Sequence, residues 1–341
     1  MNSESKYFKL FAECKLVKGN KRSAIYDLPR NSYKLIPNGL YDILSTYKTN
    51  TIDDVKRDYE KTQHSIIDEY FKMLIENEFI FFCDEDELEL FIDLEPVWDY
   101  PGQVSNAILE LPMLNESLVK SLLSLEKLGC RFIQFRSFET LDLNYVGEIM
   151  YLLKDKDFDY IEIVSKWGNE NIEDLNLILN NNQRLRVWYF HGAQENRVIK
   201  NDIVERQNIL LSKEKKTTHS NFYVNSKFYF NVNIMLFFES LNYNNYYNRK
   251  VCVNKFGDIK NCLSLEKSFG KVTHLNTINN IIQTDVFQSL WFINNDKIEV
   301  CQDCEYRYMC VDNTPIKNNK GKWIKISPCF YNPYNPNNKV K

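Results

Sequence analysis

Six of the nine cysteines in this 341-residue sequence lie within its last 90 residues, and their side chains are the strongest candidates for chemistry. Cys301 and Cys304 are separated by two residues, Cys310 follows after five more, and Cys329 comes later. Two thiols at the first spacing lie on one tight turn, and four thiolates can hold either a tetrahedral zinc ion or an iron-sulfur cluster. The spacing leaves that choice open, and disulfides are a third alternative.

Cys252 and Cys262 form a separate pair. Residues 251–262 alternate apolar and polar side chains around a turn at Lys255 to Asp258. This pattern predicts a β-hairpin in which the two thiols face each other near the open end and could reach one metal. The other three cysteines are scattered, and we expect them to be small core hydrophobes: Cys14, Cys83 and Cys130.

The composition argues against several classes of partner. The formal net charge is −3, from 43 Lys and Arg against 46 Asp and Glu, so no basic field attracts nucleic acid or an anionic membrane. The N-terminal residues contain no apolar signal segment, and apolar runs such as 234–238 are far shorter than the roughly 20 residues that cross a bilayer. We therefore expect a cytoplasmic protein, and disulfides are rare in that compartment.

Residues 1–84 predict small strands, three helices and a returning strand, the outline of a winged helix-turn-helix. Strand-like runs turn at Gly19-Asn20 and end near residue 36, helices are expected over 38–48, 51–60 and 65–79 with Asn38 and Thr51 or Asp53 as caps, and a strand is expected over 79–84. Residues 1–83 carry 13 Lys and Arg against 12 Asp and Glu, which disfavours DNA binding. An exposed strand edge beside a helix can instead bind an extended peptide.

The middle of the chain predicts an α/β fold. Residues 85–103 are acidic, contain two prolines and suggest a linker. After them, strand-like runs alternate with amphipathic helices, which is typical of βαβ units and of a partial (β/α) barrel. The strands are expected over 104–111, 131–138, 160–165 and 186–192, with a further strand over 227–238.

Chemistry in such sheets lies beyond the carboxyl ends of the strands. Five residues occupy these positions: Arg136, Ser137, Lys166, Trp167 and His191. They are equally readable as ordinary loop residues, because position at a strand end is a weak signal. The other histidines, His64, His219 and His274, are scattered, and a lone histidine is more often structural.

The last 90 residues closely resemble the SPASM domain, the auxiliary-cluster extension of many radical SAM peptide-modifying enzymes. The resemblance lies in Cys252, in Gly257 with Cys262 at the Gly-x4-Cys spacing, and in the later quartet with its Cys-x2-Cys-x5-Cys start. It implies that Cys301, Cys304, Cys310 and Cys329 bind one 4Fe-4S cluster.

The sequence departs from that family in two places. The pattern expects a cysteine where this chain has Thr314, so Cys252 and Cys262 remain as an incomplete second site to which Asp312 or another residue would have to contribute. The Cys-x3-Cys-x2-Cys motif that binds the radical-generating cluster and S-adenosylmethionine is also missing after the strand at 104–111. The resemblance therefore implies a degenerate radical SAM-like domain that does not use S-adenosylmethionine.

This combination resembles the SPASM-domain proteins of grasp-with-spasm systems, which accompany an ATP-grasp peptide ligase and a small ribosomal precursor peptide. The N-terminal segment resembles the PqqD-like element that binds leader peptides. The resemblance implies four segments: a recognition domain at 1–84, a linker at 85–103, a degenerate radical SAM-like domain at 104–245 and a SPASM-like domain at 246–341.

The function that follows is an accessory or maturase role in making a ribosomally synthesised peptide natural product. The leader peptide would bind the strand edge at Ser32 to Ile36 and the helix at Ile66 to Leu74, and no nucleic acid or membrane partner is expected. Two alternatives stay open. One is a zinc-stabilised winged-helix scaffold or regulator, and the other is a redox enzyme that uses an auxiliary 4Fe-4S cluster. The sequence does not decide whether the protein is catalytic.

Overall fold

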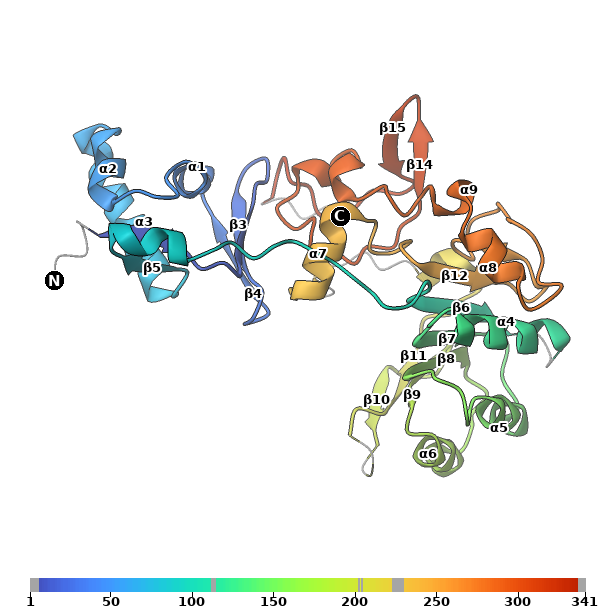
Figure 1. Cartoon of the computed structure of the whole chain (residues 1–341). Helices are drawn as coiled ribbons and strands as arrows, with labels where there is room; N and C mark the ends of the chain where they lie inside the picture. The colour runs from blue at the N-terminus through green and yellow to red at the C-terminus, as the bar shows by residue number, and fades with distance from the viewer. Residues whose placement is uncertain (1–5, 112–114, 202, 204, 223–229, 337–341) are drawn as a thin grey trace. The chain divides into compact units, whose positions relative to one another are not determined.

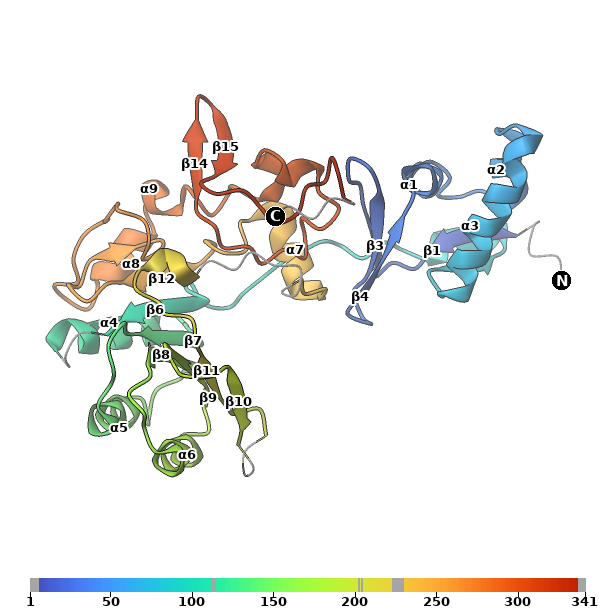
Figure 2. The same cartoon turned by 180° about the vertical axis from the view of Figure 1, so that it is seen from behind.

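The computed structural model describes residues 6–111, 115–201, 203, 205–222 and 230–336. Figures 1 and 2 show the chain from opposite sides. By internal contacts the chain forms two compact units, of which unit 1 comprises Met1–Trp98, Val224–Asn245 and Ile293–Lys341, and unit 2 comprises Asp99–Tyr223 and Tyr246–Phe292. The four segments predicted from the sequence have other boundaries than these units, and they stay a prediction. In the part of the chain that is described, no helix is both long and apolar enough to cross a membrane.

Unit 1 begins with an N-terminal module of five strands and three helices (Figure 1). Strands β1 (Tyr7–Leu10) and β5 (Ile80–Cys83) pair antiparallel, and β2 (Cys14–Val17), β3 (Ser23–Asp27) and β4 (Ser32–Ile36) form an antiparallel sheet in that order. The helices are α1 (Asn38–Thr46), α2 (Ile52–Arg57) and α3 (His64–Glu76). The predicted order of elements is present, whereas a winged-helix identity stays a prediction.

Local sequence explains where these helices begin. Thr51 caps α2 as expected, because its hydroxyl accepts from the Asp54 amide at 3.1 Å while the Asp54 carboxylate accepts from the Thr51 amide at 2.8 Å. The expectation that Asn38 caps α1 is wrong. Pro37 occupies the cap position, and the Asn38 side chain instead accepts a hydrogen bond from the Ser23 hydroxyl at 2.7 Å.

An apolar core lies between the helices and the strands of the module. Helix α3 contributes Ile67, Phe71 and Leu74, which repeat at the spacing of one helical face. They pack in one cluster with Ile25 of β3 and Ile36 of β4. The final residue of β4 is therefore fixed by the same core as α3, while the first three residues of that strand are exposed.

The rest of unit 1 comes from the later part of the sequence. It contains α7 (Ile234–Asn242), the hairpin of β14 (Ile316–Asn319) and β15 (Lys322–Lys325), and short 3-10 turns at Asn295–Lys297 and Cys301–Asp303. A second core joins these parts to the N-terminal sheet through Val17, Ala24, Tyr26 and Leu28, which pack with Val232, Phe237, Phe238, Tyr306, Tyr308 and Met309. Segments almost 300 residues apart in sequence thus share one interior.

The prediction of a strand over 227–238 is wrong for all of its described residues, because 230–233 form no regular element and the rest is helical. Residues 234–238 open helix α7, and the side chain of Asn233 accepts from the Leu236 amide at 2.8 Å as an N-cap. A short run of consecutive apolar residues fits a buried strand and a buried helix equally well, so periodicity does not separate them. Residues 227–229 lie outside the described residues.

Unit 2 is built on an eight-stranded, mostly parallel sheet. Its order is β10 (Arg197–Lys200), β11 (Asn208–Ser212), β9 (Leu185–His191), β8 (Tyr160–Lys166), β7 (Phe132–Arg136), β6 (Asn106–Glu110), β12 (Lys250–Val253) and β13 (Ile259–Lys260). Only the two end strands are antiparallel to their neighbours. The helices are α4 (Glu116–Lys127), α5 (Leu143–Leu152), α6 (Ile172–Asn181), α8 (Thr277–Ile282) and α9 (Asp285–Gln288).

The α/β class and the alternation of β6 to β9 with α4 to α6 confirm the expected pattern of the middle segment. Each helix buries one face, as α4 does with Leu118, Leu122 and Leu125. The register of β6 and β7 places Glu110 opposite Arg136, so their carboxyl ends meet at one edge. Within the described residues the two end strands do not pair with each other, and the sheet is open.

Candidate functional site

The four cysteines of the predicted quartet all belong to unit 1. Cys301 begins a 3-10 turn, Cys304 follows it, Cys310 comes after two further turns, and Cys329 lies beyond β15. All four residues are partly buried. Among the side chains that are described, no three or more His, Cys, Asp or Glu are arranged so that they could hold a metal ion. Binding a metal would therefore require these turns to adjust.

The four thiols share an environment that disfavours their charged forms. Burial raises the pKa of Cys301 to about 11 and that of Cys310 to about 12, and it raises the pKa values of Cys304 and Cys329 as well. The negative charge of Cys329 adds to the effect on Cys301, and the charges of Cys310 and Cys301 add to the effect on Cys304. The thiols therefore favour their protonated forms, and a zinc ion or an iron-sulfur cluster would deprotonate them on binding.

Backbone amides already point at two of these sulfurs. The Tyr306 amide donates to Cys304 Sγ, and the Tyr331 amide donates to Cys329 Sγ, each at 3.4 Å. Such amide contacts stabilise the charged form of a thiol and surround iron-sulfur clusters in proteins. The quartet thus combines four soft ligands with backbone hydrogen bonds, although the structure does not bring the sulfurs into a metal-holding arrangement.

A cavity of about 400 Å³ opens beside the quartet, and Cys301 and Cys329 both line it. Lys325 of β15 lines the same cavity. Its ammonium pairs with Asp312 at 2.5 Å, and both side chains are buried. From the sequence, Asp312 was a candidate extra ligand for the pair Cys252 and Cys262. In the structure its carboxylate accepts hydrogen bonds from the Lys325 ammonium and, at 2.8 Å, from the Thr314 amide.

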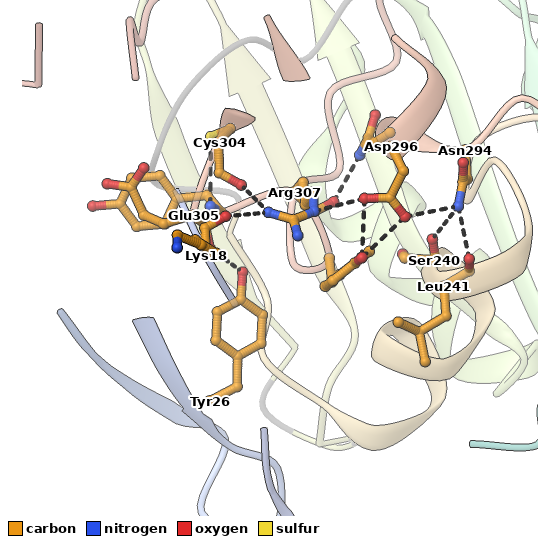
Figure 3. A network of polar contacts seen from close by, with 12 residues as sticks. Lys18, Tyr26, Ser240, Leu241, Asn294, Asp296, Cys304, Glu305 and Arg307 are labelled. Carbon is orange, nitrogen blue, oxygen red and sulfur yellow. Dashed lines mark hydrogen bonds and ion pairs between the residues drawn. The ribbon is translucent and has the colours of Figure 1, made fainter. Parts of the chain in front are cut away.

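The segment between Cys304 and Cys310 is bound to the N-terminal sheet by a buried carboxylate. Glu305 has no exposed surface, and its Oε1 accepts from Arg22 at 2.7 Å and from the Tyr331 hydroxyl at 2.6 Å. The Tyr26 hydroxyl of β3 donates to the Glu305 carbonyl oxygen at 2.7 Å, as Figure 3 shows. Gly19 allows this approach, since a Cβ there would lie 3.0 Å from the Glu305 amide nitrogen and would clash with the Arg22 carbonyl.

Arg307 continues this connection in the opposite direction. Its guanidinium donates to the Lys18 carbonyl oxygen at 2.6 Å and to the Asp296 carboxylate at 2.7 Å (Figure 3). Asp296 also accepts from Asn294, whose amide reaches the Leu241 carbonyl oxygen at the end of α7 at 2.7 Å. The cysteine segment is therefore held between the N-terminal sheet and α7 by hydrogen bonds as well as by the shared core.

The pair Cys252 and Cys262 lies in unit 2, on the predicted hairpin. The prediction that the two thiols face each other across this hairpin is wrong, because the register places Lys260 opposite Cys252 and Cys262 lies beyond the end of β13. Gly257 turns the chain with a φ of +83°, and both thiols are buried. Burial and the neighbouring charge of Cys262 raise the pKa of Cys252 to about 12. Cys262 Sγ contacts the hydroxyls of Tyr246 at 3.2 Å and Ser264 at 3.1 Å. The described residues add no third metal ligand to this pair.

The five strand-end candidates do lie at the carboxyl ends of the sheet. Arg136, Lys166 and His191 are the last residues of β7, β8 and β9, and Ser137 and Trp167 directly follow β7 and β8. His191 is buried, its Nε2 lies 3.4 Å from the Ser137 carbonyl oxygen, and its Nδ1 lies 3.4 Å from the Lys216 amide. Arg136 is also buried, donates to Gln134 Oε1 at 2.5 Å, and lies 4.0 Å from the Phe222 ring centre.

Sequence reasoning missed a carboxylate at this edge. Glu110 ends β6, is buried, and lies 3.5 Å from His219 Nε2. Burial opposes its charge, but the hydrogen bonds from His219 and from the Lys255 amide are stronger, and the pKa of Glu110 is lowered. The position of Glu110 at the end of a predicted strand could have marked it as a candidate. His219 lies seven residues after β11, so its sequence position gave no such indication.

Comparisons with known proteins identify no family. No family model matches the chain, and no curated protein matches it. Two crystal structures of Streptococcus suis SuiB, one bound to precursor peptide SuiA and one bound to S-adenosylmethionine, align with a TM-score of 0.25 each. Their identities are 10% and 9%, and each alignment covers 89% of this chain and 94% of the other. A TM-score this low does not establish a common fold.

Proposed function

We propose that this protein binds a ribosomally made precursor peptide and acts as an accessory or maturase protein in peptide natural-product biosynthesis, beside an ATP-grasp peptide ligase. The quartet of Cys301, Cys304, Cys310 and Cys329 would hold a 4Fe-4S cluster. The cluster would stabilise the turns that carry these thiols, since they have little regular structure of their own. The pair in unit 2 would remain without metal.

One observation carries this proposal: unit 1 joins an exposed strand edge directly to the cysteine segment. In the described residues β4 pairs only with β3, and Ser32, Tyr33 and Lys34 are exposed. Tyr33 packs edge-to-face on Tyr306, with 5.7 Å between ring centres. A peptide that added itself to β4 would thus lie next to the segment that leads from Cys304.

The N-terminal module suits a peptide better than DNA. Main-chain groups along the free side of β4 can bond an extended chain of any sequence, and side-chain contacts would supply the specificity. Helix α3 adds apolar surface, because Ile66 and Ile75 are 47% and 44% exposed. Both side chains could contact a peptide through apolar surface, whereas the near-neutral charge of the module gives no electrostatic attraction to the phosphates of DNA.

The test is metal and sulfide analysis of protein purified without oxygen. We expect a brown protein that contains iron and sulfide in equal amounts, because four thiolates complete a 4Fe-4S cluster. Cys301→Ser and Cys304→Ser should each lose iron, whereas Cys130→Ser, which removes a buried thiol of unit 2, should keep it. A colourless protein with bound zinc would favour the scaffold alternative.

Peptide binding is measured on the same preparations. Fluorescence anisotropy with labelled precursor peptides encoded beside the gene should show saturable binding, and a peptide with its leader segment scrambled should not bind. Retention of an ATP-grasp ligase on immobilised protein would support the partnership. Failure of every neighbouring precursor to bind, or a salt-dependent affinity for DNA instead, would contradict the proposed role.

A further inference from the structure

The two faces of strand β4 differ in the side chains that they carry. Successive residues of a strand point to opposite faces, so Tyr33 and Leu35 share one face. The other face carries Ser32, Lys34 and Ile36. Leu35 packs against the core shared with the later chain, and Ile36 belongs to the core beneath helix α3. The exposed residues of β4 therefore present an aromatic ring on one face and polar groups on the other.

Tyr33 is the exposed end of a cluster of aromatic side chains. It is 41% exposed, and its ring packs edge-to-face on Tyr306 with 5.7 Å between ring centres. Tyr306 is buried and packs in turn on Phe230 at 4.7 Å and on Tyr331 at 5.0 Å. Its hydroxyl accepts from Arg22 at 3.1 Å. Tyr306 thus fixes one side of the Tyr33 ring, and the exposed remainder can contact a further aromatic or apolar side chain.

On the opposite face, Lys34 is an exposed cation. Within the described residues its ammonium forms no hydrogen bond and no ion pair. Two other lysines of the N-terminal module are paired: Lys18 lies 2.8 Å from Asp42, and Lys56 lies 2.6 Å from Asp68. Since opposite charges on neighbouring strands attract, Lys34 is suited to an acidic side chain on a strand beside β4.

The backbone of β4 is open to such a strand. In the described part of the chain β4 pairs only with β3, and no turn or loop forms a main-chain hydrogen bond with Ser32–Ile36. A peptide that extended the sheet would place alternate side chains on its two faces, because the side-chain period of a strand is two. One row of side chains would lie beside Tyr33, and the other would lie beside Lys34.

We propose that β4 selects an amphipathic extended peptide, with aromatic or large apolar side chains in the row beside Tyr33 and acidic side chains in the row beside Lys34. This inference rests on the proposed function, because it names the class of precursor peptide that the strand edge binds. It requires no metal at the cysteine quartet. Tyr33 and Lys34 are specificity-determining residues, and Tyr306 is a positioning residue. The complete peptide site therefore includes a residue of the cysteine segment.

The first test uses fluorescence anisotropy with the full-length protein and a labelled precursor peptide encoded beside the gene. Tyr33→Ser should bind the peptide about fivefold more weakly than the parent protein, because one aromatic contact is lost. Tyr33→Phe keeps the ring and should bind like the parent. Tyr151→Ser removes a 77% exposed tyrosine of helix α5 in unit 2, and as the matched control it should bind normally.

The same contact is measured from the side of the peptide. Serine substitutions of alternate aromatic or large apolar residues in the peptide should weaken its binding to the parent protein by a similar factor. These peptides should lose little further affinity for Tyr33→Ser, since the contact is then already absent. The measurements on the parent protein stand by themselves if Tyr33→Ser does not fold.

The second test reverses the charge of Lys34. Lys34→Glu should bind the precursor peptide about threefold more weakly at low salt, and the difference should shrink as added salt screens the exposed charges. Replacing an acidic residue of the peptide by lysine should restore the affinity for Lys34→Glu. Lys200→Glu, on the edge strand β10 of unit 2, is the matched control and should have no effect.

Parent-like affinities of both Tyr33→Ser and Lys34→Glu, for a precursor peptide that the parent protein binds, would overturn the inference and leave the proposed function intact. Equal losses in these variants and in their unit 2 controls would overturn it as well. A loss in one variant alone would remove the other residue from the site. A parent protein that binds no precursor peptide would overturn the proposed function and this inference together.

Discussion

At the scale of single residues, His191 shows how one buried ring links pH to stability. Its Nδ1 accepts from the Lys216 amide, and its Nε2 faces the Ser137 carbonyl oxygen. Both contacts suit a neutral ring with its proton on Nε2. Protonation would place a second N–H against the Lys216 amide. Burial, together with the charges of Lys216 and Lys166, therefore lowers the pKa of His191, although Ser137 and Glu139 act in the other direction.

The sign of the pH effect follows from this lowered pKa. Below about pH 6.5 the unfolded chain binds a proton at this histidine that the folded chain does not, so stability is complete above that pH and falls as the pH decreases. We expect the thermal midpoint of unit 2 to drop by several degrees between pH 7.5 and pH 5.5, with a smaller drop in His191→Gln. Differential scanning calorimetry at both pH values measures this. Equal slopes in the two proteins would show that another group is responsible.

The buried acid Glu305 is the residue that sequence reasoning could not have found. Its partner Arg22 lies 283 positions away, and nothing in either local sequence marks the pair. The cysteines were found because their spacing carries chemical meaning by itself. Their ligand role stays a prediction, since sequence spacing fixes neighbours along the chain and not the distances between folded turns.

At the scale of elements, strand β4 is where the proposed peptide contact can be tested. Consecutive residues of an antiparallel strand point their N–H groups alternately to the partner strand and away from it. Of the two substitutions Tyr33→Pro and Lys34→Pro, one therefore removes an N–H group from the free edge of β4 and leaves the hydrogen bonds to β3 intact. That variant should bind the precursor peptide about tenfold more weakly while its circular dichroism stays unchanged. The matched control is Val198→Pro, on the exposed edge strand β10 of unit 2, and it should bind normally.

The helices and strands that could be predicted are those whose local sequence alone determines their type and bounds. Strands β6 to β9 were expected close to their observed bounds, because short β-rich runs alternate there with amphipathic helices. Helix α7 was missed because Ile234 to Phe238 form a continuous apolar run that has no period. The pairing of β12 with β6 was missed as well, since it joins residues about 145 positions apart in register. Long-range pairings of this kind leave no local mark.

At the scale of the whole molecule, the two units should respond differently to metal. The quartet, the sheet of β2 to β4 and helix α7 share unit 1 through a common core and the contacts of Glu305 and Arg307. A ligand that binds the folded state stabilises the cooperative unit that contains its site. We expect metal loading to slow amide hydrogen exchange over residues 14–36 as well as over 301–329.

Mass spectrometry of peptic peptides from loaded and metal-free protein measures this exchange. Peptides from the sheet of unit 2, such as those covering β7 and β8, should exchange equally in both forms. Slower exchange confined to residues 301–329 would mean that the cysteine segment responds alone. A uniform change across all peptides would mean that the chain unfolds as one body, against the division into two units.

The buried face of the sheet of β2 to β4 has a practical consequence for anyone who wishes to study leader recognition in isolation. A fragment that ends at residue 84 would expose Val17, Ala24, Tyr26 and Leu28 to water. It would also lack Glu305, the ion-pair partner of Arg22. Such a fragment should self-associate unless those apolar positions are first made polar. Peptide affinities measured on it would then describe a sheet without the residues of the later chain that pack against it.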